Sequence, residues 1–338
     1  MNKITLPFLC FLVVLFSNSM SAKNEVDKLK KNKVYESTLY SISIEKVPNL
    51  GLHSYNSDSL PKRIDKIHIL PAFLEETSGL CETVEGIWSI NDSQNPSELF
   101  LLQRHAYIRW RDSGISISEN DFVIFELSYP NTDWEALESD GEYLYIGDFG
   151  NNRGNRKDLK IIKISVDTLK KRVDYSSEYK QRIDCKSLKG EIISFSYKDQ
   201  KDFNIRRLHN FDCEAMVIRD TTIILLSKNW RSLSCDVYEV PKRLGSYSLS
   251  KSGEFNPRFL VTDATEAHGK IYFCGYGPSG KQYIGEVNST NFKKCKRKKL
   301  PIKPAQIEGI HFDKSVQQII LSTESRKQQK QALLILGE

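Results

Sequence analysis

The apolar positions of this chain fall into short runs of strand length, and one arrangement of these runs recurs five times. Each copy opens on a small residue next to acidic or hydroxyl side chains, followed by a short apolar run, a turn and a second, strongly apolar run. The small residue precedes the polar end of the second run by 12 to 14 residues in every copy. Short apolar runs bounded by turn residues are typical of buried β-strands. The five openings are at 77–80, 134–137, 213–216, 262–265 and 307–310.

The intervals between the copies indicate the kind of repeat. From Gly79 through Ala136, Ala215 and Ala264 to Gly309 they are 57, 79, 49 and 45 residues. The last two match the roughly 40–50 residues of a four-stranded propeller blade, and the first two leave room for long loops. Third strands are expected at 97–101, 159–164 and 236–240, and fourth strands at 122–125, 192–195 and 258–261.

We therefore predict an all-β fold, a β-propeller with five visible repeat units and four-stranded blades. The chain ends on an apolar run at 332–336, a third strand with no fourth strand after it, while a spare strand at 66–70 precedes the first copy. In a closed propeller this N-terminal strand completes the last blade and removes an exposed edge. Predicted helix is close to nil. A sixth blade, hidden in the 79-residue interval or the N-terminal segment, is the alternative, and an open β-sandwich fits the repeat less well.

The first residues predict export. Residues 1–22 combine Lys3 with an apolar run from Leu6 to Phe16 and a small-residue stretch suited to cleavage, which is the pattern of a signal peptide. Residues 23–62 form a polar N-terminal arm, and residues 63–338 form the propeller domain. No later segment is apolar for long enough to span a bilayer, so we predict an exported chain without a transmembrane segment.

Removal of the signal leaves six cysteines, without any C-x-x-C spacing, at 81, 185, 213, 235, 274 and 295. A zinc site built from them is therefore not expected. An oxidising compartment permits disulfides, and one bridge, two bridges or none all fit the sequence.

The net charge of +6 is too dispersed to predict a nucleic-acid partner, which needs a basic face and a docking motif. The strongest basic run is Lys293–Lys299. It could touch an anionic surface, although a solvated outer strand protected against edge pairing explains it better.

Several motifs resemble those of a family of exported bacterial β-propellers, mostly uncharacterised, which is similar to the phytase-like esterase and the regucalcin and paraoxonase propellers. The residues that carry the resemblance are at 77–80, 88–93, 133–137, 145–152, 212–216 and 227–229. It covers roughly residues 64–338. The resemblance implies a propeller fold and, through distant relatives, a divalent cation at the central channel with hydrolysis of esters or lactones.

The repeat itself places acidic residues on the propeller axis, because the innermost strand of each blade lines the channel. Four carboxylates and one hydroxyl brought to one ring require a compensating cation, protons or backbone donors. Hard oxygen ligands suit Ca²⁺ or Mg²⁺. Equivalent positions are held by Ser78, Glu135, Glu214, Asp263 and Glu308, and Asn91, Asp92, Asp148, Asn151, Asn152 and Asn229 follow the second strands.

The candidate metal ligands are therefore Glu135, Glu214, Asp263, Glu308, Asp148 and Asp92. The alternative for each one is structural, because short acidic side chains also accept backbone N–H groups and fix corners between blades.

Other motifs point to ordinary structure. Residues 275–280 spell G-x-G-x-x-G, but no helix is expected after them, so a turn between two strands is favoured over a dinucleotide site. His68 alternates with Ile67 and Ile69, which predicts an outward strand position for the histidine. The mixture of arginine and aromatic residues around Trp110 is expected on a loop, where it would contact a ligand or pack over a blade.

Taken together, these patterns predict an exported binding or interaction protein, with Ca²⁺ or Mg²⁺ as a candidate ion in its channel. The expected partner is a protein, a glycan or a small molecule at the channel mouth. The alternative is a metal-dependent hydrolase of esters, lactones or phosphoesters. A third hypothesis is a sensor or adhesion surface built from the loops at 104–120 and 150–158.

Overall fold

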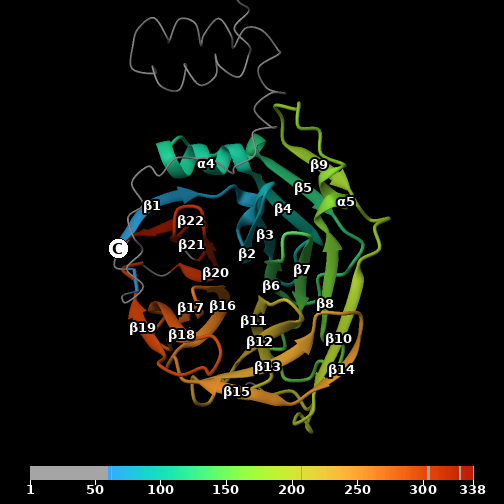
Figure 1. Cartoon of the computed structure of the whole chain (residues 1–338), viewed down its shortest axis with the longest axis vertical. Coiled ribbons are helices and arrows are strands. Elements are labelled where there is room, and N and C mark those ends of the chain that lie inside the picture. The colour runs from blue at the N-terminus through green and yellow to red at the C-terminus, as the bar shows by residue number, and fades with distance from the viewer. Residues whose placement is uncertain (1–59, 62, 207, 303–304, 327–328, 338) are drawn as a thin grey trace, which may run out of the picture. The chain divides into compact units, whose positions relative to one another are not determined.

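The strands of the propeller domain form five sheets arranged as blades around a common centre (Figure 1). The structure is a computed structural model that describes residues 60–61, 63–206, 208–302, 305–326 and 329–337. The predicted signal peptide and nearly all of the predicted N-terminal arm therefore lie outside the described residues.

In blade order, the strands are as follows. The first blade contains β2 (Thr77–Thr83), β3 (Gly86–Asn91), β4 (Glu98–Gln103), β5 (Phe122–Glu126) and β9 (Gln181–Asp184). The second blade contains β6 (Trp134–Ser139), β7 (Tyr143–Asp148), β8 (Lys160–Ser165), β10 (Glu191–Tyr197) and β14 (Gly245–Leu249). The third contains β11 (Asp212–Ile218), β12 (Thr222–Lys228), β13 (Cys235–Pro241) and β15 (Lys251–Phe255), and the fourth contains β16 (Leu260–Ala267), β17 (Lys270–Tyr276), β18 (Gln282–Asn288) and β19 (Lys296–Lys299). The fifth contains β20 (Gln306–Asp313), β21 (Gln318–Glu324), β22 (Ala332–Gly337) and β1 (Arg63–Ile69).

The five innermost strands, β2, β6, β11, β16 and β20, form a closed ring in which each strand lies beside the next and β20 returns to β2. These strands are almost wholly buried, because both of their faces are covered by neighbouring blades. The prediction of a β-propeller is confirmed, and the number of blades is five.

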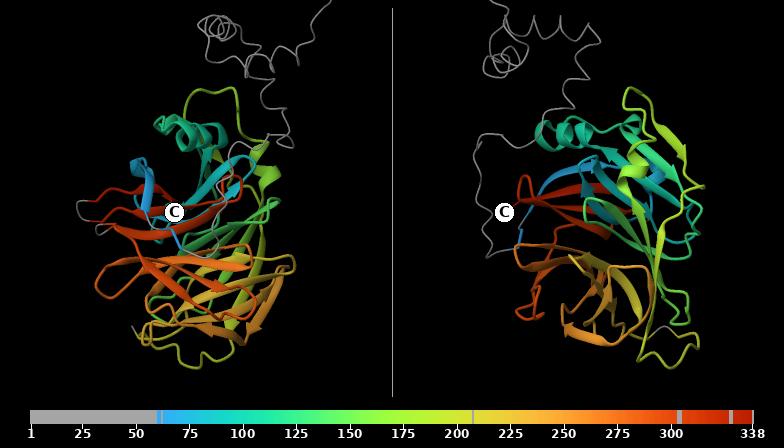
Figure 2. Two further views of the ribbon diagram at one scale, coloured as in Figure 1. Left: turned by 60° about the vertical axis from the view of Figure 1, so that its left-hand side comes forward. Right: turned by 45° about the vertical axis from the view of Figure 1, so that its right-hand side comes forward.

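The ring is closed by the predicted N-terminal strand. β1 pairs antiparallel with β22, so that Ile67 lies opposite Leu334 and Ile69 opposite Ala332. Figure 2 shows the blue β1 lying along the red strands of the last blade. This pairing covers the outer edge of β22, which an open chain would leave exposed.

The 79-residue interval contains no sixth blade but includes a strand that crosses to another blade. β9, which follows the third strand of the second blade, pairs in parallel with β5 at the edge of the first blade. In the same way β14, from the third blade, pairs in parallel with β10 at the edge of the second. Each of these two blades therefore has a fifth strand supplied by the blade that follows it in the chain.

The structure corrects the predicted fourth strand of the third blade. That strand is β15, whereas the predicted run at 258–261 leads into the inner strand β16. Two minor predictions are confirmed: the basic residues Lys296–Lys299 form the exposed outer strand β19, and the glycine-rich residues after Gly275 end β17 and turn into β18.

The described residues are almost entirely strand and loop, as expected, apart from two α-helices. Residues Arg104–Ser113 form α4, which ends at Gly114 in a left-handed conformation, and a shorter helix, α5, spans Val166–Lys170. Tyr107 and Trp110 on α4 are buried between the first and fifth blades. The packing interpretation is thus confirmed for Tyr107 and Trp110, and the segment that contains them is a helix where a loop was expected.

The predicted outward position of His68 was also wrong. His68 is half-buried with its ring 6.0 Å from that of Trp110, while Ile67 and Ile69 are 60% and 49% exposed. Exposure alternates without a break along β1, and α4 covers the face that carries His68 through Trp110, so the two isoleucines are on the exposed face.

The six described cysteines form no disulfide with one another, and all except the half-buried Cys295 are buried. In the same part of the chain, no helix is long and apolar enough to cross a membrane.

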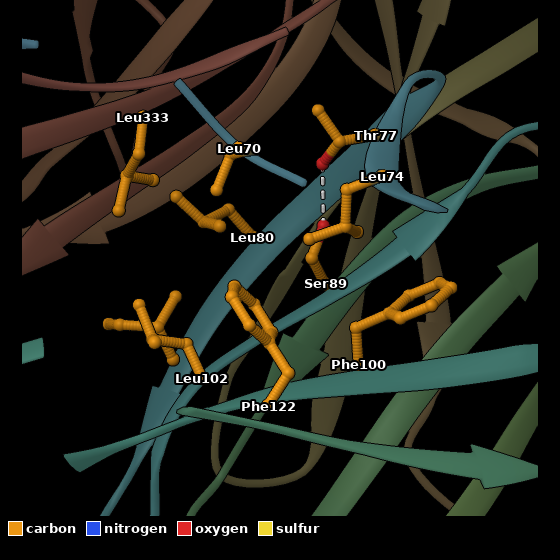
Figure 3. Close-up of a pocket in the computed structure, with 10 residues that line it drawn as sticks. Leu70, Leu74, Thr77, Leu80, Ser89, Phe100, Leu102, Phe122 and Leu333 are labelled. Carbon is orange, nitrogen blue, oxygen red and sulfur yellow. Dashed lines mark hydrogen bonds between the residues drawn. The ribbon is translucent and has the colours of Figure 1, made fainter. Parts of the chain in front are cut away.

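A small cavity of about 20 Å³ lies in the core between the first blade and the end of the last one (Figure 3). Leu80, Phe100 and Leu333 are among the apolar side chains around it, and the hydroxyls of Thr77 and Ser89 bond to each other at 2.6 Å. Because its lining is almost entirely apolar, this space belongs to the hydrophobic core and does not suit a polar ligand.

We expect the substitution Leu80→Ala to lower the free energy of unfolding by about 2–5 kcal/mol, since it enlarges this cavity. Ile67→Ala on β1 is the matched control, because that side chain is mostly exposed; its effect should stay within about 0.5 kcal/mol. Urea unfolding of the two variants measures the difference. Equal losses would contradict both the core position of Leu80 and the orientation of β1.

Candidate functional site

All five inner strands start at the same end of the channel, here called the mouth, and each has a β-bulge near its start. The unpaired residue of the bulge is Glu135 in β6, Glu214 in β11 and Glu308 in β20. In β2 and β16 it is Gly79 and Thr262. Since a bulge redirects its extra residue, three glutamates occupy equivalent positions, whereas Ser78 and Asp263 lie one place away from them.

Ser78 and Asp263 link neighbouring blades. The Ser78 hydroxyl donates to the carbonyl oxygen of Glu135 at 2.8 Å, and Oδ2 of Asp263 accepts the backbone N–H of Ile310 at 2.8 Å. At Gly79, with φ of +68°, a Cβ atom would lie 2.3 Å from the backbone nitrogen of Leu137. The first blade therefore has no room for a side chain at its bulge, and it contributes to the mouth through the loop after β3.

Three carboxylates meet at the mouth, here called the carboxylate cluster: Asp92, Asp133 and Glu135. One oxygen of each lies within 4.8 Å of the others. Asp92 follows β3 of the first blade, Asp133 precedes β6 of the second, and Glu135 is within β6. The sequence prediction included Asp92 and Glu135 but missed Asp133, although Asp133 stands two residues before Glu135.

Among the described residues, no lysine or arginine forms an ion pair with these oxygens, although the charges of Lys228 and Arg156 partly offset the raised pKa values of the cluster. Glu135 is only 5% exposed, and its carboxylate has no hydrogen bond or ion pair with the described residues. A Cβ atom on Gly150 would lie 2.4 Å from Oε1 of Glu135 and 2.5 Å from Oδ2 of Asp133. A side chain at this position would therefore displace at least one of the two carboxylates.

The other two glutamates of the mouth lie near a buried lysine. Nζ of Lys228, the last residue of β12, is 2.6 Å from Oε2 of Glu214, and both side chains are almost fully buried. Oε1 of Glu214 is buried and has no hydrogen-bond partner among the described residues. Glu308 is buried in the adjoining part of the ring and accepts a hydrogen bond from Gln306.

Burial and mutual repulsion favour the protonated form of these acids. Burial, followed by the charges of Asp92 and Asp212, raises the pKa of Asp133 to about 7. Burial also raises the pKa of Glu308 to about 8 and that of Glu324 to about 7. Burial raises the pKa of Glu135 well above its ordinary range. Burial acts in the same direction on the pKa of Glu214, but there Lys228 opposes it from 2.6 Å and keeps the carboxylate in an ion pair. Without a bound cation, the mouth therefore retains protons near neutral pH.

Asp148 lies outside the carboxylate cluster and is held by cations. Its fully buried carboxylate is 2.9 Å from Nη2 of Arg156 and 2.6 Å from Nζ of Lys160, and it accepts the backbone N–H of Asp133 at 3.2 Å. Asp148 therefore has the structural role that the sequence left open for the acidic residues, in which a carboxylate accepts a backbone N–H and fixes a corner of the fold. Asp148 thus fixes the backbone beside the cluster.

The asparagines that follow the second strands mostly hold loops. Asn151 donates from its backbone N–H to Asp212 and from its side chain to the carbonyl oxygen of Phe211, which fastens the loop after β7 to the third blade. Asn91 donates to the carbonyl oxygen of Phe73, and Asn229 accepts two backbone N–H groups of its own turn. Asn152 is exposed.

At the opposite end of the channel, Glu138 provides a useful comparison. It lies on the same strand as Glu135 and is also buried, and burial raises the pKa of Glu138 to about 8. Its carboxylate accepts only the neighbouring N–H of Ser139 among the described residues.

Comparisons with known proteins assign neither a family nor a function to the chain. No family model and no curated protein matches the chain, so the resemblance to phytase-like and regucalcin-type propellers has no support from these comparisons. Among solved structures, the chain is similar to the WD40 domain of Toxoplasma gondii coronin, with 8% identity and a TM-score of 0.37 over 83% of this chain and 77% of that one.

Two further structures are similar at the same level. The Neurospora crassa Pan2 WD40 domain has 8% identity and a TM-score of 0.29 over 80% of this chain and 65% of that one. A chain of the mitotic checkpoint complex has 13% identity and a TM-score of 0.34 over 76% of this chain and 62% of that one. This chain thus covers less than two thirds of the length of each of these two proteins. The assignment of a five-bladed β-propeller therefore rests on the strand pairing described above.

The raised pKa values predict that the cation-free protein loses stability as pH rises. Between the pKa values of the unfolded chain, near 4, and those of the folded mouth, about 7 to 8, the folded state binds more protons, so the free energy of unfolding falls with pH across this window. Urea unfolding in chelator at pH 5 and pH 8 measures this effect. Glu308→Gln should make the dependence shallower, and a wild-type stability that increases from pH 5 to pH 8 would contradict this assignment.

Proposed function

We propose that this protein is a binding protein that holds a divalent cation at its channel mouth, in the carboxylate cluster of Asp92, Asp133 and Glu135. The observation that carries the proposal is the convergence of three carboxylate oxygens within 4.8 Å beside a buried, unpaired Glu135. Isolated carboxylates this close repel each other strongly, and a cation removes that repulsion.

The chemistry of the donors favours Ca²⁺ or Mg²⁺. All the groups are carboxylates, which are hard oxygen ligands, and they come from two blades of a rigid ring. Ca²⁺ fits better, since it accepts six to eight oxygens in irregular geometry, whereas Mg²⁺ requires near-ideal octahedral coordination. Glu214, Glu308, Asp263 and Asp148, also predicted as ligands, are not members of this cluster.

The cluster is accessible from one side, which makes a binding role reasonable. Asp92 and Asp133 are half-buried, in contrast to Glu135, so solvent reaches the cluster on their side. A cation held there would have coordination positions available to a ligand. We therefore propose that a protein, a glycan or a small molecule binds at the mouth through oxygen atoms that complete the coordination of the cation.

Export of the protein remains a proposal that rests on residues 1–22 of the sequence. An exported protein would meet the millimolar calcium concentrations for which extracellular sites of modest affinity are adapted.

Calcium binding by the metal-free protein tests the proposal directly. We expect the wild type to bind one Ca²⁺ in isothermal titration calorimetry, and Glu135→Gln to weaken the affinity at least about tenfold, because it removes one charged ligand. Glu138→Gln is the control, since it neutralises a buried glutamate of the same strand at the other end of the channel; it should bind as the wild type does.

If millimolar Ca²⁺ and Mg²⁺ both fail to bind and leave the melting temperature unchanged, the cation site does not exist and the acidic residues are structural. An equal loss of affinity in the Glu135 and Glu138 variants would place the ion elsewhere.

A metal-dependent hydrolase is the second candidate, favoured by the same open side of the cluster. A divalent cation supplies a Lewis acid and a bound water of lowered pKa for attack on an ester, lactone or phosphoester. The chain itself would position that water through Asp92 and Asp133, which are the half-buried members of the cluster.

For this candidate we expect Ca²⁺- or Mg²⁺-dependent turnover in a panel of aryl esters, lactones and phosphoesters, and at least a hundredfold loss of activity in Asp133→Asn. The absence of turnover from a preparation that binds the cation stoichiometrically would leave the binding function and eliminate the hydrolase.

A further inference from the structure

We propose that Lys228 is an internal cation that fills a second cation position at the mouth, on Glu214, and so limits the mouth to one external divalent ion. This inference rests on the proposed function, because it concerns how many ions the acidic mouth accepts. Nothing in the sequence pattern indicated it, since Lys228 simply ends an apolar strand.

The position of Lys228 is built from several elements. Its Nζ is 2.6 Å from Oε2 of Glu214, on the neighbouring inner strand, and only 5% of its side chain is exposed. Nζ also lies 5.5 Å from the ring centroids of Trp230 and Tyr276, which come from the third and fourth blades. A carboxylate and two aromatic rings are the groups that stabilise a desolvated ammonium.

Lys228 forms its ion pair on one side of the mouth, and only its charge at longer range acts on the carboxylate cluster. Glu214 is ion-paired with it, whereas no lysine or arginine of the described residues lies within ion-pair distance of the carboxylate cluster. The external ion is therefore expected at the cluster, in the first and second blades. The third blade already contains its cation as a side chain.

Glu214 shows what the position would offer if the lysine were absent. Oε1 of Glu214 is buried without a partner, and Oε2 would lose its partner, so both oxygens would be available. A buried carboxylate without a counter-charge either takes up a proton or binds another cation. When Ca²⁺ is in solution and Lys228 is absent, we therefore expect a second calcium ion to bind at Glu214.

The experiment counts calcium ions per chain by isothermal titration calorimetry of the metal-free, full-length mature protein with CaCl₂ at pH 8. We expect one ion in the wild type and two in Lys228→Gln. The double variant Lys228→Gln, Glu214→Gln should return to one ion, because the second position then lacks its carboxylate.

Lys270→Gln is the matched control. Lys270 also pairs with a buried carboxylate, at 3.0 Å from Oε2 of Glu286, but it starts β17 opposite the last residue of β16, at the end away from the mouth. This variant should bind one ion. If Lys228→Gln does not fold, Lys228→Met replaces it, since methionine retains the aliphatic contact with Trp230 and Tyr276.

The outcomes separate this inference from the function on which it rests. A wild type that binds no cation overturns both. A wild type and a folded Lys228 variant that each bind one ion overturn only the role of Lys228, whatever the change in affinity. A second ion that persists in the double variant also overturns it, because Glu214 is then not its ligand.

Discussion

The pairing of β1 with β22 is the interaction on which the rest of the structure depends. A propeller brings its inner strands to one axis only if the ring is closed, and here closure joins a strand that precedes the first blade to the last strand of the chain. Asp92 and Glu135 come from the first two blades, Glu214 from the third and Glu308 from the fifth. Their meeting at one mouth is therefore a consequence of closure and not of sequence proximity.

Closure also explains how so many acidic groups are tolerated. Short polar side chains link neighbouring blades near the starts of their inner strands: the Ser78 hydroxyl donates to the carbonyl oxygen of Glu135, and Asp263 accepts the N–H of Ile310. These bonds hold the backbone in place while the glutamates of the bulges remain close together. Because the frame is rigid, the glutamates cannot move apart to relieve their repulsion. Binding of a proton, of Lys228 or of a metal ion relieves it instead.

Much of the fold could be predicted from the sequence, because a propeller repeats one local pattern. The inner strands, the offset to the second strands and the closing strand all follow from apolar runs and their spacing. The parallel strands β9 and β14 could not be found in this way, since their pairing partners belong to another blade. The helix α4 was missed because it follows β4 directly without a capping side chain, although Tyr107, Trp110 and Gly114 carry the spacing and the end of a helix.

The site was predicted only in part for a related reason. Equivalent positions along the repeat identified Glu135, Glu214 and Glu308. In β16 the bulge residue is Thr262 and not Asp263, so Asp263 does not share their position. Asp133 lies before its strand, and only the folded loop brings it next to Glu135. Gly150 lies against the carboxylates of Glu135 and Asp133, and Lys228 lies against that of Glu214. These contacts depend on the folded structure, so the spacing of residues along the sequence does not reveal them.

The exchange of strands between blades has a consequence for the order in which the chain folds. The first blade needs β9, the second needs β14, and the fifth needs β1, so only the third and fourth blades are made entirely of strands from their own stretch of chain. Completion of the first and second blades has to wait for later segments, and closure has to wait for the last strand. Such long-range pairing makes folding slow and highly cooperative. Once formed, the ring cannot unravel blade by blade from either end, because each terminal blade is held by a strand from a distant part of the chain.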